Sequence, residues 1–294
     1  MRLHVTMDVP VETLLNDRDM EYLKGEGLTE LSIPYSFYDM PADAVQTRGR
    51  ELTAMGFHIN TCHPPFGGGN RPNSLCAEVE EVRQRTIEVY THYIRAFALT
   101  GMKVIPVHTG GAMHPAGGAK ALDRLTDTLE RLLPEAEKTG VILALENTFY
   151  ANPCPFSDAP NPSGVMEKFI NDDCRMLADY VRAWNSPWIR VCMDVGHSQL
   201  YGHDPAEDLA TLAPLVALYH IQDNDGVDDL HYNVGVGRYP WGMLRRRLQQ
   251  ERSEAVLFDE VLSDPDPEMR KILHKPERIA HYFRQAERVM NEKD

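Results

Sequence analysis

Several features that many proteins depend on are missing from this sequence of 294 residues. No stretch approaches the roughly 18 consecutive apolar residues that a membrane span needs, and the N-terminal segment MRLHVTMDVP has no apolar core of a secretion signal. The five cysteines are scattered, odd in number and without a CxxC pair, which is the pattern of reduced thiols. We therefore predict a soluble, cytoplasmic protein that needs no disulfide bonds and no membrane.

Basic residues are also scarce. The chain has 30 Lys and Arg against 44 Asp and Glu, so its formal charge is −14 and its isoelectric point lies near 5.3. A protein that binds nucleic acid broadly through phosphates needs a basic face. The charge therefore argues against nucleic acid as a partner and favours a small molecule, although a local basic groove stays compatible with it.

What the sequence does contain is a regular alternation of short apolar runs, rich in β-branched residues, with longer segments of helical period. The runs expected to be strands are Leu3–Met7, Glu30–Pro34, His58–Thr61, Lys103–His108, Val141–Glu146, Ile189–Asp194, Val216–Ile221 and Ala255–Glu260. The segments expected to be helices are Val11–Lys24, Ala42–Met55, Ala77–Thr100, Ala119–Thr139, Met166–Asn185, Pro205–Leu215, Trp241–Arg252 and Pro276–Asn291.

This alternation predicts a parallel sheet covered by helices, and eight units in a chain of this length match the size of a (β/α)8 barrel. A doubly wound open sheet is the alternative. It would usually carry a glycine-rich loop after its first strand, and the segment MDVPVETLL contains no glycine. We therefore predict an α/β protein, a (β/α)8 TIM barrel that forms a single domain over residues 1–294.

Polar side chains follow six successive predicted strands, at the end where a barrel builds its active site. They are His63, His108, Glu146, Asp194 with His197, His220 and Glu260, and the long segment after the seventh strand adds Asp229 and His231. Histidines and carboxylates that converge without basic partners are the ligands of a divalent metal ion. The sequence therefore predicts a metal site, and it leaves Mn²⁺, Zn²⁺, Co²⁺ and Mg²⁺ as alternatives.

The segments ALEN, MDVGH, YHIQDN and FDE, in this order on the last four predicted strands, resemble the xylose-isomerase-like TIM barrel superfamily. That superfamily includes sugar-phosphate isomerases and epimerases, ketose 3-epimerases, inosose dehydratases and apurinic endonucleases. The resemblance covers essentially the whole chain. In the epimerases it implies a metal held by Glu146, Asp194, His220 and Glu260, with Glu146 and Glu260 also exchanging the proton of the substrate carbon.

The apurinic endonuclease branch uses a larger ligand set that holds three zinc ions, and every position of that set has a match here. The additional matches are His63, His108, His197, Asp229 and His231, which the resemblance implies to be ligands of a second metal or substrate contacts. Ketose 3-epimerases carry an Arg where this chain has Gly226 and a Glu where it has Asn152, so membership of that branch is not implied.

The function we predict from the residues and the resemblance is that of a divalent-metal-dependent isomerase or epimerase. Its substrate would be a sugar, polyol or related polyhydroxy carbonyl compound, converted through a metal-stabilised cis-enediolate with Glu146 and Glu260 as acid and base. Weaker expectations are a phosphate or carboxylate contact at Arg238 and apolar walls at Trp241 and Phe66.

Two other reactions stay open as alternatives. A lyase or dehydratase would act on a similar substrate, because an enediolate can also expel a β-hydroxyl group. A multinuclear zinc phosphodiesterase of the apurinic endonuclease type is favoured by the complete ligand set and disfavoured by the charge of −14. The sequence shows no interface, so it leaves both a monomer and a homo-oligomer open.

Overall fold

The computed structural model describes residues 2–68, 70–109, 118–148, 169–200 and 203–292. Eight parallel strands form one sheet in the order β3-β2-β1-β8-β7-β6-β5-β4. The strands are β1 (Val5–Asp8), β2 (Glu30–Ser32), β3 (His58–Thr61), β4 (Val104–Val107), β5 (Ile142–Glu146), β6 (Ile189–Asp194), β7 (Val216–His220) and β8 (Val256–Asp259). Each predicted strand is confirmed, and the boundaries differ by at most two residues.

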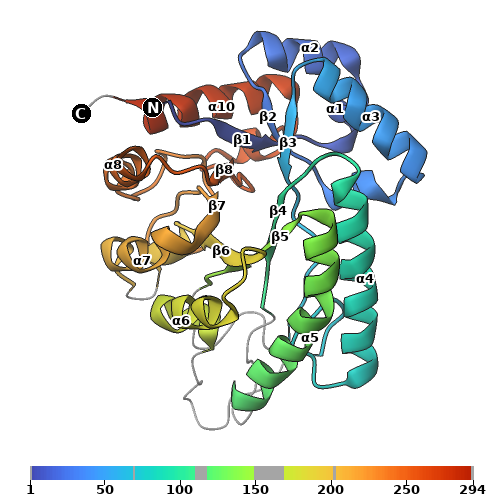
Figure 1. The fold of residues 1–294 in the computed structure, drawn as a ribbon. Coiled ribbons are helices and arrows are strands. Elements are labelled where there is room, and N and C mark those ends of the chain that lie inside the picture. The colour runs from blue at the N-terminus through green and yellow to red at the C-terminus, as the bar shows by residue number, and fades with distance from the viewer. Residues whose placement is uncertain (1, 69, 110–117, 149–168, 201–202, 293–294) are drawn as a thin grey trace.

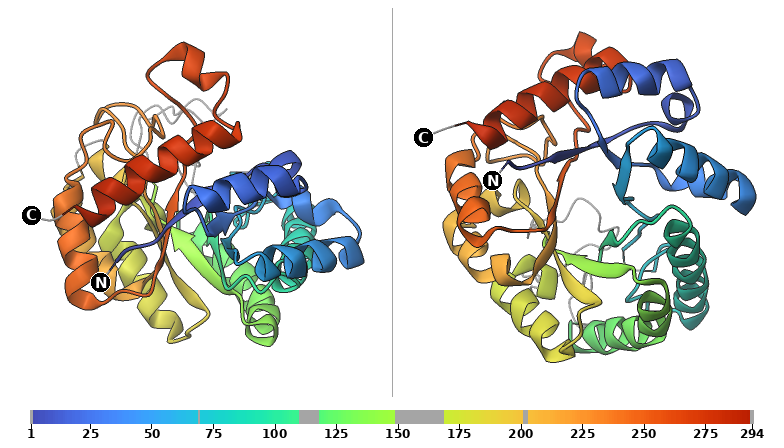
Figure 2. Two further views of the ribbon diagram at one scale, coloured as in Figure 1. Left: turned by 90° about the horizontal axis from the view of Figure 1, so that it is seen from above. Right: turned by 45° about the horizontal axis from the view of Figure 1, so that its top comes forward.

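The sheet curls into a barrel with the helices on its outer side (Figures 1 and 2). The two ends of the strand order, β3 and β4, lie next to each other, which brings the sheet around to a closed ring. The open-sheet alternative is therefore excluded, and the predicted (β/α)8 barrel is confirmed. No helix among the described residues is long and apolar enough to cross a membrane.

The α-helices lie in the connections after the strands, as a barrel requires. They are α1 (Val11–Leu14), α2 (Asp17–Gly25), α3 (Ala42–Ala54), α4 (Glu80–Ala98), α5 (Gly118–Thr139), α6 (Cys174–Trp184), α7 (Pro205–Leu212), α8 (Trp241–Glu251), α9 (Pro267–Arg270) and α10 (Pro276–Asn291). Short 3-10 turns lie at η1 (Tyr35–Asp39), η2 (Ile170–Asp172), η3 (His197–Gln199) and η4 (Ala213–Leu215).

Four of the predicted helices differ clearly from the structure. The helix predicted at Ala77–Thr100 is Glu80–Ala98, and the one predicted at Pro205–Leu215 ends at Leu212 and continues as a 3-10 turn. A capping side chain explains the other two differences. The segment Val11–Lys24 is two helices, because the Asn16 side chain accepts hydrogen bonds from the backbone N–H groups of Arg18 and Asp19 and so starts α2. The helix expected to begin at Met166 begins at Cys174, where Asp173 caps it in the same way. Residues 166–168 of that expectation lie outside the described residues.

Alternating side chains along each strand divide the apolar core in two. The larger part lies between the sheet and the helices. The smaller part fills the barrel itself and consists of Val104, Ala144, Cys192, Leu218 and Phe258 with the flanking Ile142, Ala217 and Val256. These apolar side chains fill the barrel interior below the carboxyl ends of strands β4 to β8. The inward-facing residues that follow them, at the carboxyl ends of these strands, therefore line the end of the barrel where active sites form.

Candidate metal centre and active site

The structure gathers the predicted His, Asp and Glu residues at the carboxyl ends of strands β3 to β8. The nine are His63, His108, Glu146, Asp194, His197, His220, Asp229, His231 and Glu260, and they lie in a central group with a second group on each side of it. The parallel register explains part of this convergence, since Asp194 on β6 is the direct partner of His220 on β7.

The central group surrounds the imidazole of His220. Its Nδ1 lies 3.1 Å from Oε2 of Glu260, 3.7 Å from Oε1 of Glu146 and 3.9 Å from Oδ2 of Asp194. Carboxylates from three different strands therefore point at one position beside one imidazole. These are the four residues predicted to hold the metal.

The buried polar atoms of this group fit a metal ion. Oε2 of Glu146, Oδ2 of Asp194 and both ring nitrogens of His220 are buried without a hydrogen-bond partner. Unpaired buried polar atoms are costly, and a cation bound between these residues would satisfy several of them. The donor set of one nitrogen and several carboxylate oxygens suits a divalent ion.

A second group flanks the centre on the side of β3 and β4. Nε2 of His63 lies 3.1 Å from Nε2 of His108, and that atom lies 3.2 Å from Oε2 of Glu146. Phe66, which is 53% exposed, stacks on the His108 ring with centroids 4.0 Å apart. The structure thus places Phe66 at the edge of the candidate site, where it forms an apolar wall over His108.

A third group flanks the centre on the side of β6 and the loop after β7. Nε2 of His197 lies 3.4 Å and Nε2 of His231 lies 3.3 Å from Oδ2 of Asp229. His231 adopts a left-handed backbone conformation with φ of 47°, which turns its ring back toward Glu260. The loop therefore brings two candidate ligands, Asp229 and His231, back to the rim.

Three of the histidines share one orientation. The Nδ1–H groups of His63, His197 and His231 donate to the backbone carbonyls of Pro64, Asn147 and Glu260 at 2.9, 2.9 and 3.2 Å. Each ring therefore presents its Nε2 atom to the cluster. A backbone acceptor that fixes one nitrogen while the other faces the site is the usual support of a metal-binding histidine.

Neutral amides hold Asp194 in place. Asn147 accepts from the Asp194 N–H at 2.8 Å and donates to its carbonyl at 3.0 Å, which ties β5 to β6. The Gln222 amide donates to Oδ1 of Asp194 and to Oδ1 of Asp229, both at 3.1 Å. Sequence reasoning assigned no role to either amide, although both directly follow strand ends.

Burial and the local charges set the protonation of the central group. Burial opposes ionisation of Glu260, but the charges of His220, His231 and His63 outweigh it and lower its pKa to about 2. Burial likewise opposes the charged form of His220, while Cys192, Glu260 and Glu146 raise its pKa well above the usual value. In the metal-free protein the carboxylates are therefore balanced by imidazolium ions.

The flanking histidines differ from one another. Burial disfavours the charged form of His197, yet the carboxylates of Asp194 and Asp229 raise its pKa to about 10. Burial also disfavours the charged form of His231, whose pKa is raised to about 9 by the carboxylates of Asp229 and Glu260. Burial and the neighbouring charge of His108 instead lower the pKa of His63 to about 4. The β3 side of the rim therefore offers a neutral imidazole at neutral pH.

Two predicted substrate contacts, Trp241 and Arg238, have other partners than the cluster. Trp241 begins α8, is only 7% exposed, and its Nε1–H donates to Oδ2 of Asp223 at 2.8 Å, which favours a packing role. Arg238 is exposed on the loop after β7, where its backbone N–H donates to the carbonyl of Asn224. Among the described residues, neither side chain pairs with a member of the cluster.

Asp8 is a rim residue that sequence reasoning missed. It ends β1, and the Ser32 hydroxyl at the end of β2 donates to its Oδ1 at 3.3 Å. Burial raises the pKa of Asp8 to about 7, the bond from Ser32 opposes this shift, and the charge of Glu260 adds to it. A carboxylate directly after an apolar strand was the available signal, and it was the same signal that identified Glu146.

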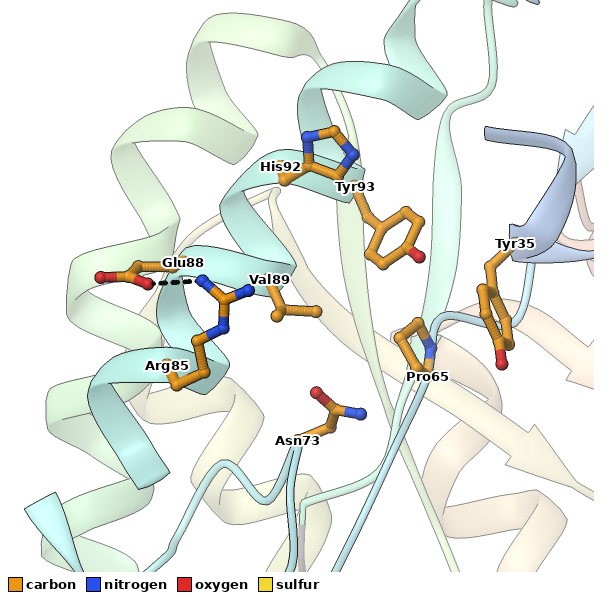
Figure 3. Close-up of a pocket in the computed structure, with 8 residues that line it drawn as sticks. All are labelled: Tyr35, Pro65, Asn73, Arg85, Glu88, Val89, His92 and Tyr93. Carbon is orange, nitrogen blue, oxygen red and sulfur yellow. Dashed lines mark hydrogen bonds and ion pairs between the residues drawn. The ribbon is translucent and has the colours of Figure 1, made fainter. Parts of the chain in front are cut away.

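A separate pocket of about 590 Å³ lies beside the loop between β3 and α4 (Figure 3). Its lining includes Tyr35, Pro65, Arg85, His92 and Tyr93 and none of the nine clustered residues. Pro65 lines the pocket and the next residue, Phe66, stacks on His108, so one loop contributes to both the pocket and the candidate metal centre. This pocket is thus distinct from the place where the nine clustered residues converge.

Solved structures of sugar epimerases share this fold. The 3-keto-D-glucoside 4-epimerase of E. coli superimposes with a TM-score of 0.71 and 16% identity over 97% of this chain and 100% of the epimerase. The D-psicose 3-epimerase of Clostridium cellulolyticum H10 superimposes with a TM-score of 0.69 and 12% identity over 97% and 99%. Identities this low establish the common fold and no more.

Sequence comparison gives the family. An uncharacterised protein of Methanocaldococcus jannaschii is 25% identical over 236 residues, which are 79% of this chain and 71% of the relative. Residues 25–279 match the family described as the xylose isomerase-like TIM barrel, in agreement with the resemblance seen in the strand-end segments. The chain therefore belongs to the xylose isomerase-like TIM barrel family.

Proposed function

We propose that this protein is a divalent-metal-dependent isomerase or epimerase of a sugar, polyol or related polyhydroxy carbonyl compound. The observation that carries the proposal is the approach of two glutamates, from different strands, to the same ring nitrogen of one imidazole. Glu260 on the β8 side lies 3.1 Å and Glu146 on β5 lies 3.7 Å from Nδ1 of His220. Two carboxylates around one cation site can serve both as ligands and as proton carriers.

The bound ion would be held by Glu146, Asp194, His220 and Glu260, and it would supply Lewis acidity to a carbonyl group and the adjacent hydroxyl. Glu260, with 13% of its side chain exposed, is open to the rim, whereas Glu146 is almost fully buried. Glu260 therefore accepts the proton from the carbon beside the carbonyl. If Glu260 returned that proton to the neighbouring carbon while a hydroxyl proton moved between the two oxygens, the substrate would be isomerised. If Glu146, carrying a proton of its own, delivered it to the opposite face of the original carbon, the substrate would be epimerised and Glu260 would keep the abstracted proton.

The rim supplies further groups for a polyhydroxy compound. Asp8 with Ser32 lies on the β1–β2 side, and His197 with Asp229 lies on the β6–β7 side. Carboxylates and imidazoles accept and donate hydrogen bonds to hydroxyl groups. The exposed Phe66 ring adds an apolar face of the kind that packs against the C–H face of a sugar. The epimerases that share the fold support a carbohydrate-like substrate, and the same rim would serve a lyase or dehydratase on such a substrate.

A multinuclear hydrolase is the second candidate, and the two flanking groups favour it. The Nε2 atoms of His63 and His108 face each other at 3.1 Å, and those of His197 and His231 both face Asp229. Nitrogens that face each other at this distance repel unless a proton or a metal lies between them. In the described part of the chain the cluster carboxylates pair with histidines and not with Lys or Arg, so a phosphodiester would find few cationic contacts.

Metal content and hydrogen exchange separate these candidates. We expect purified protein to bind a divalent metal and, when metal-replete, to incorporate deuterium from heavy water into a ketose, inosose or keto-glycoside. A lyase would release water from the same panel. Three metal equivalents together with cleavage of abasic duplex DNA, and no deuterium incorporation into any carbonyl substrate, would replace the isomerase by the hydrolase.

A further inference from the structure

A second group of metal-ligating side chains lies outside the barrel rim, between helices α6 and α7. It consists of Cys174, the first residue of α6, His203, which precedes the Asp204 cap of α7, and Asp208 on α7. One ligand atom of each residue lies within 4.8 Å of those of the other two. The two helices pack side by side, so this cluster joins elements that follow β5 and β6 (Figure 1).

We propose that Cys174, His203 and Asp208 form a binding site for a borderline-soft divalent metal ion, with Zn²⁺ as the ion that their donor set selects. Thiolate, imidazole and carboxylate are all zinc ligands, and the sulfur distinguishes this set from the nitrogen and oxygen donors of the rim. Three protein ligands leave one coordination position for water. The inference is independent of the function proposed above.

The spacing of the nitrogen and oxygen donors agrees with one edge of a tetrahedron. His203 Nδ1 lies 3.1 Å from Oδ2 of Asp208. Zn–N and Zn–O bonds of about 2.0–2.2 Å at tetrahedral angles place two such ligand atoms about 3.3 Å apart. A small outward movement of two side chains would therefore admit the ion.

The charge around Asp208 also favours a cation. Asp208 is 7% exposed and Cys174 is 4% exposed, so a carboxylate and a thiol share a nearly dry position. Within the described ranges, the ion-pair partner of Asp208 is His203 alone, while Asp173 and Glu207 add negative potential near the thiol. A buried carboxylate without a permanent cation beside it is unfavourable. Binding of Zn²⁺ would release the thiol proton and leave both ring and carboxylate as ligands.

The position of the cluster suggests what the ion would do. Helices α6 and α7 follow the strands that carry Glu146 and Asp194, and their first turns lie at the rim end of the barrel. A metal that joins these two first turns would fix the segments after β5 and β6 relative to each other. The ion would therefore hold the first turns of α6 and α7 together.

Cobalt substitution tests the proposal, because a thiolate ligand gives Co²⁺ a charge-transfer absorption in the near ultraviolet and nitrogen or oxygen ligands do not. Cys192 lies close to Glu146 and His220 at the barrel centre, so Cys192→Ala is the control for a thiolate signal from there. We expect the band in the unmodified protein and in Cys192→Ala, its loss in Cys174→Ser, and one metal equivalent fewer in Cys174→Ser.

A second variant covers the case in which Cys174→Ser folds poorly. Asp208→Asn keeps the volume of the side chain and its oxygen acceptor, and we expect it to weaken zinc binding at this site at least about tenfold. Alkylation of Cys174 in the unmodified protein should be slower with Zn²⁺ than with a chelator. Equal metal content in all variants, no thiolate band in the unmodified protein, or a band lost only in Cys192→Ala would each overturn the proposal.

Discussion

Gly196 lies directly against the side-chain amide of Gln222, so closely that a Cβ atom on Gly196 would come within 2.1 Å of it. The same amide donates to Asp194 and to Asp229, and Gly196 itself follows Asp194 by two residues. The absence of a side chain at one residue thus allows one amide to bridge the central and the third ligand group.

Replacing Gly196 by Ala should therefore disturb the metal site without removing a ligand. We expect a loss of about 1–3 kcal/mol in the free energy of unfolding from overpacking and a fall of about 10–100-fold in metal affinity. Gly25→Ala is the matched control, because nothing lies within 4 Å of a Cβ there. Urea unfolding and metal titration measure both quantities, and unchanged metal affinity in Gly196→Ala would show that Gln222 does not position the ligands.

The raised pKa values of His197 and His231 make the stability of the metal-free protein depend on pH. When the pKa of a histidine is higher in the folded state than its usual value of 6.5, its protonation stabilises the folded protein. This stabilisation is complete below pH 6.5 and is lost as the pH rises through the pKa of the folded state. The pKa of about 9 for His231 and of about 10 for His197 set the upper end of the pH range over which this stabilisation is lost. The melting temperature of chelator-treated protein should therefore fall between pH 6.5 and about 10.

Metal binding should show the opposite dependence over the same window. The ion must displace the protons held by these rings, so its affinity increases with pH. We expect the difference in melting temperature between metal-loaded and metal-free protein to widen from pH 6.5 to 9. A metal-free protein that becomes more stable over this range would contradict the protonation assigned to the rim.

Trp241 gives a prediction that separates packing from substrate contact. Asp223 is buried and accepts from the backbone N–H groups of Asn224, Gly235 and Tyr239 as well as from Nε1 of Trp241. Trp241→Phe removes one donor from this buried carboxylate and should cost about 1–3 kcal/mol of stability. The KM of the exchange reaction should stay unchanged, whereas a sugar-stacking role would raise it.

Trp188→Phe is the control for that substitution. Trp188 is a half-buried tryptophan that packs on the same core, and among the described residues no hydrogen bond of its indole N–H is present. We expect a smaller loss of stability from it than from Trp241→Phe in the same urea titration. Equal losses would mean that the bond to Asp223 contributes nothing beyond burial.

The strands and the rim were predictable because both depend on local patterns. A strand buried on both sides is a nearly continuous apolar run, and β6, which is such a strand, was predicted to the residue. The rule that strand ends meet at one face then placed Glu146 and Glu260 in a single site. These predictions needed no knowledge of tertiary contacts.

Three other features could not be predicted, because they depend on contacts between segments that are distant in the sequence and produce no local sequence pattern. Cys174, His203 and Asp208 lie on a helix start, a loop and a helix, and nothing in their spacing indicates that α6 and α7 bring them together. The contact of Gly196 with Gln222 likewise joins two strand ends that are separated by a whole helix. The role of Trp241 could not be assigned because its partner Asp223 lies 18 residues earlier in the sequence.

The central claim is that Glu260 carries a proton as well as holding the metal. In Glu260→Gln the amide oxygen can still coordinate an ion but cannot accept a proton. Deuterium wash-in to the substrate by metal-saturated Glu260→Gln is therefore the most direct measurement. We expect the exchange rate to fall by about two to four orders of magnitude and to stay low in excess metal. Recovery to a near-normal rate when metal is added would show that Glu260 is a ligand only, and would contradict the two-glutamate mechanism.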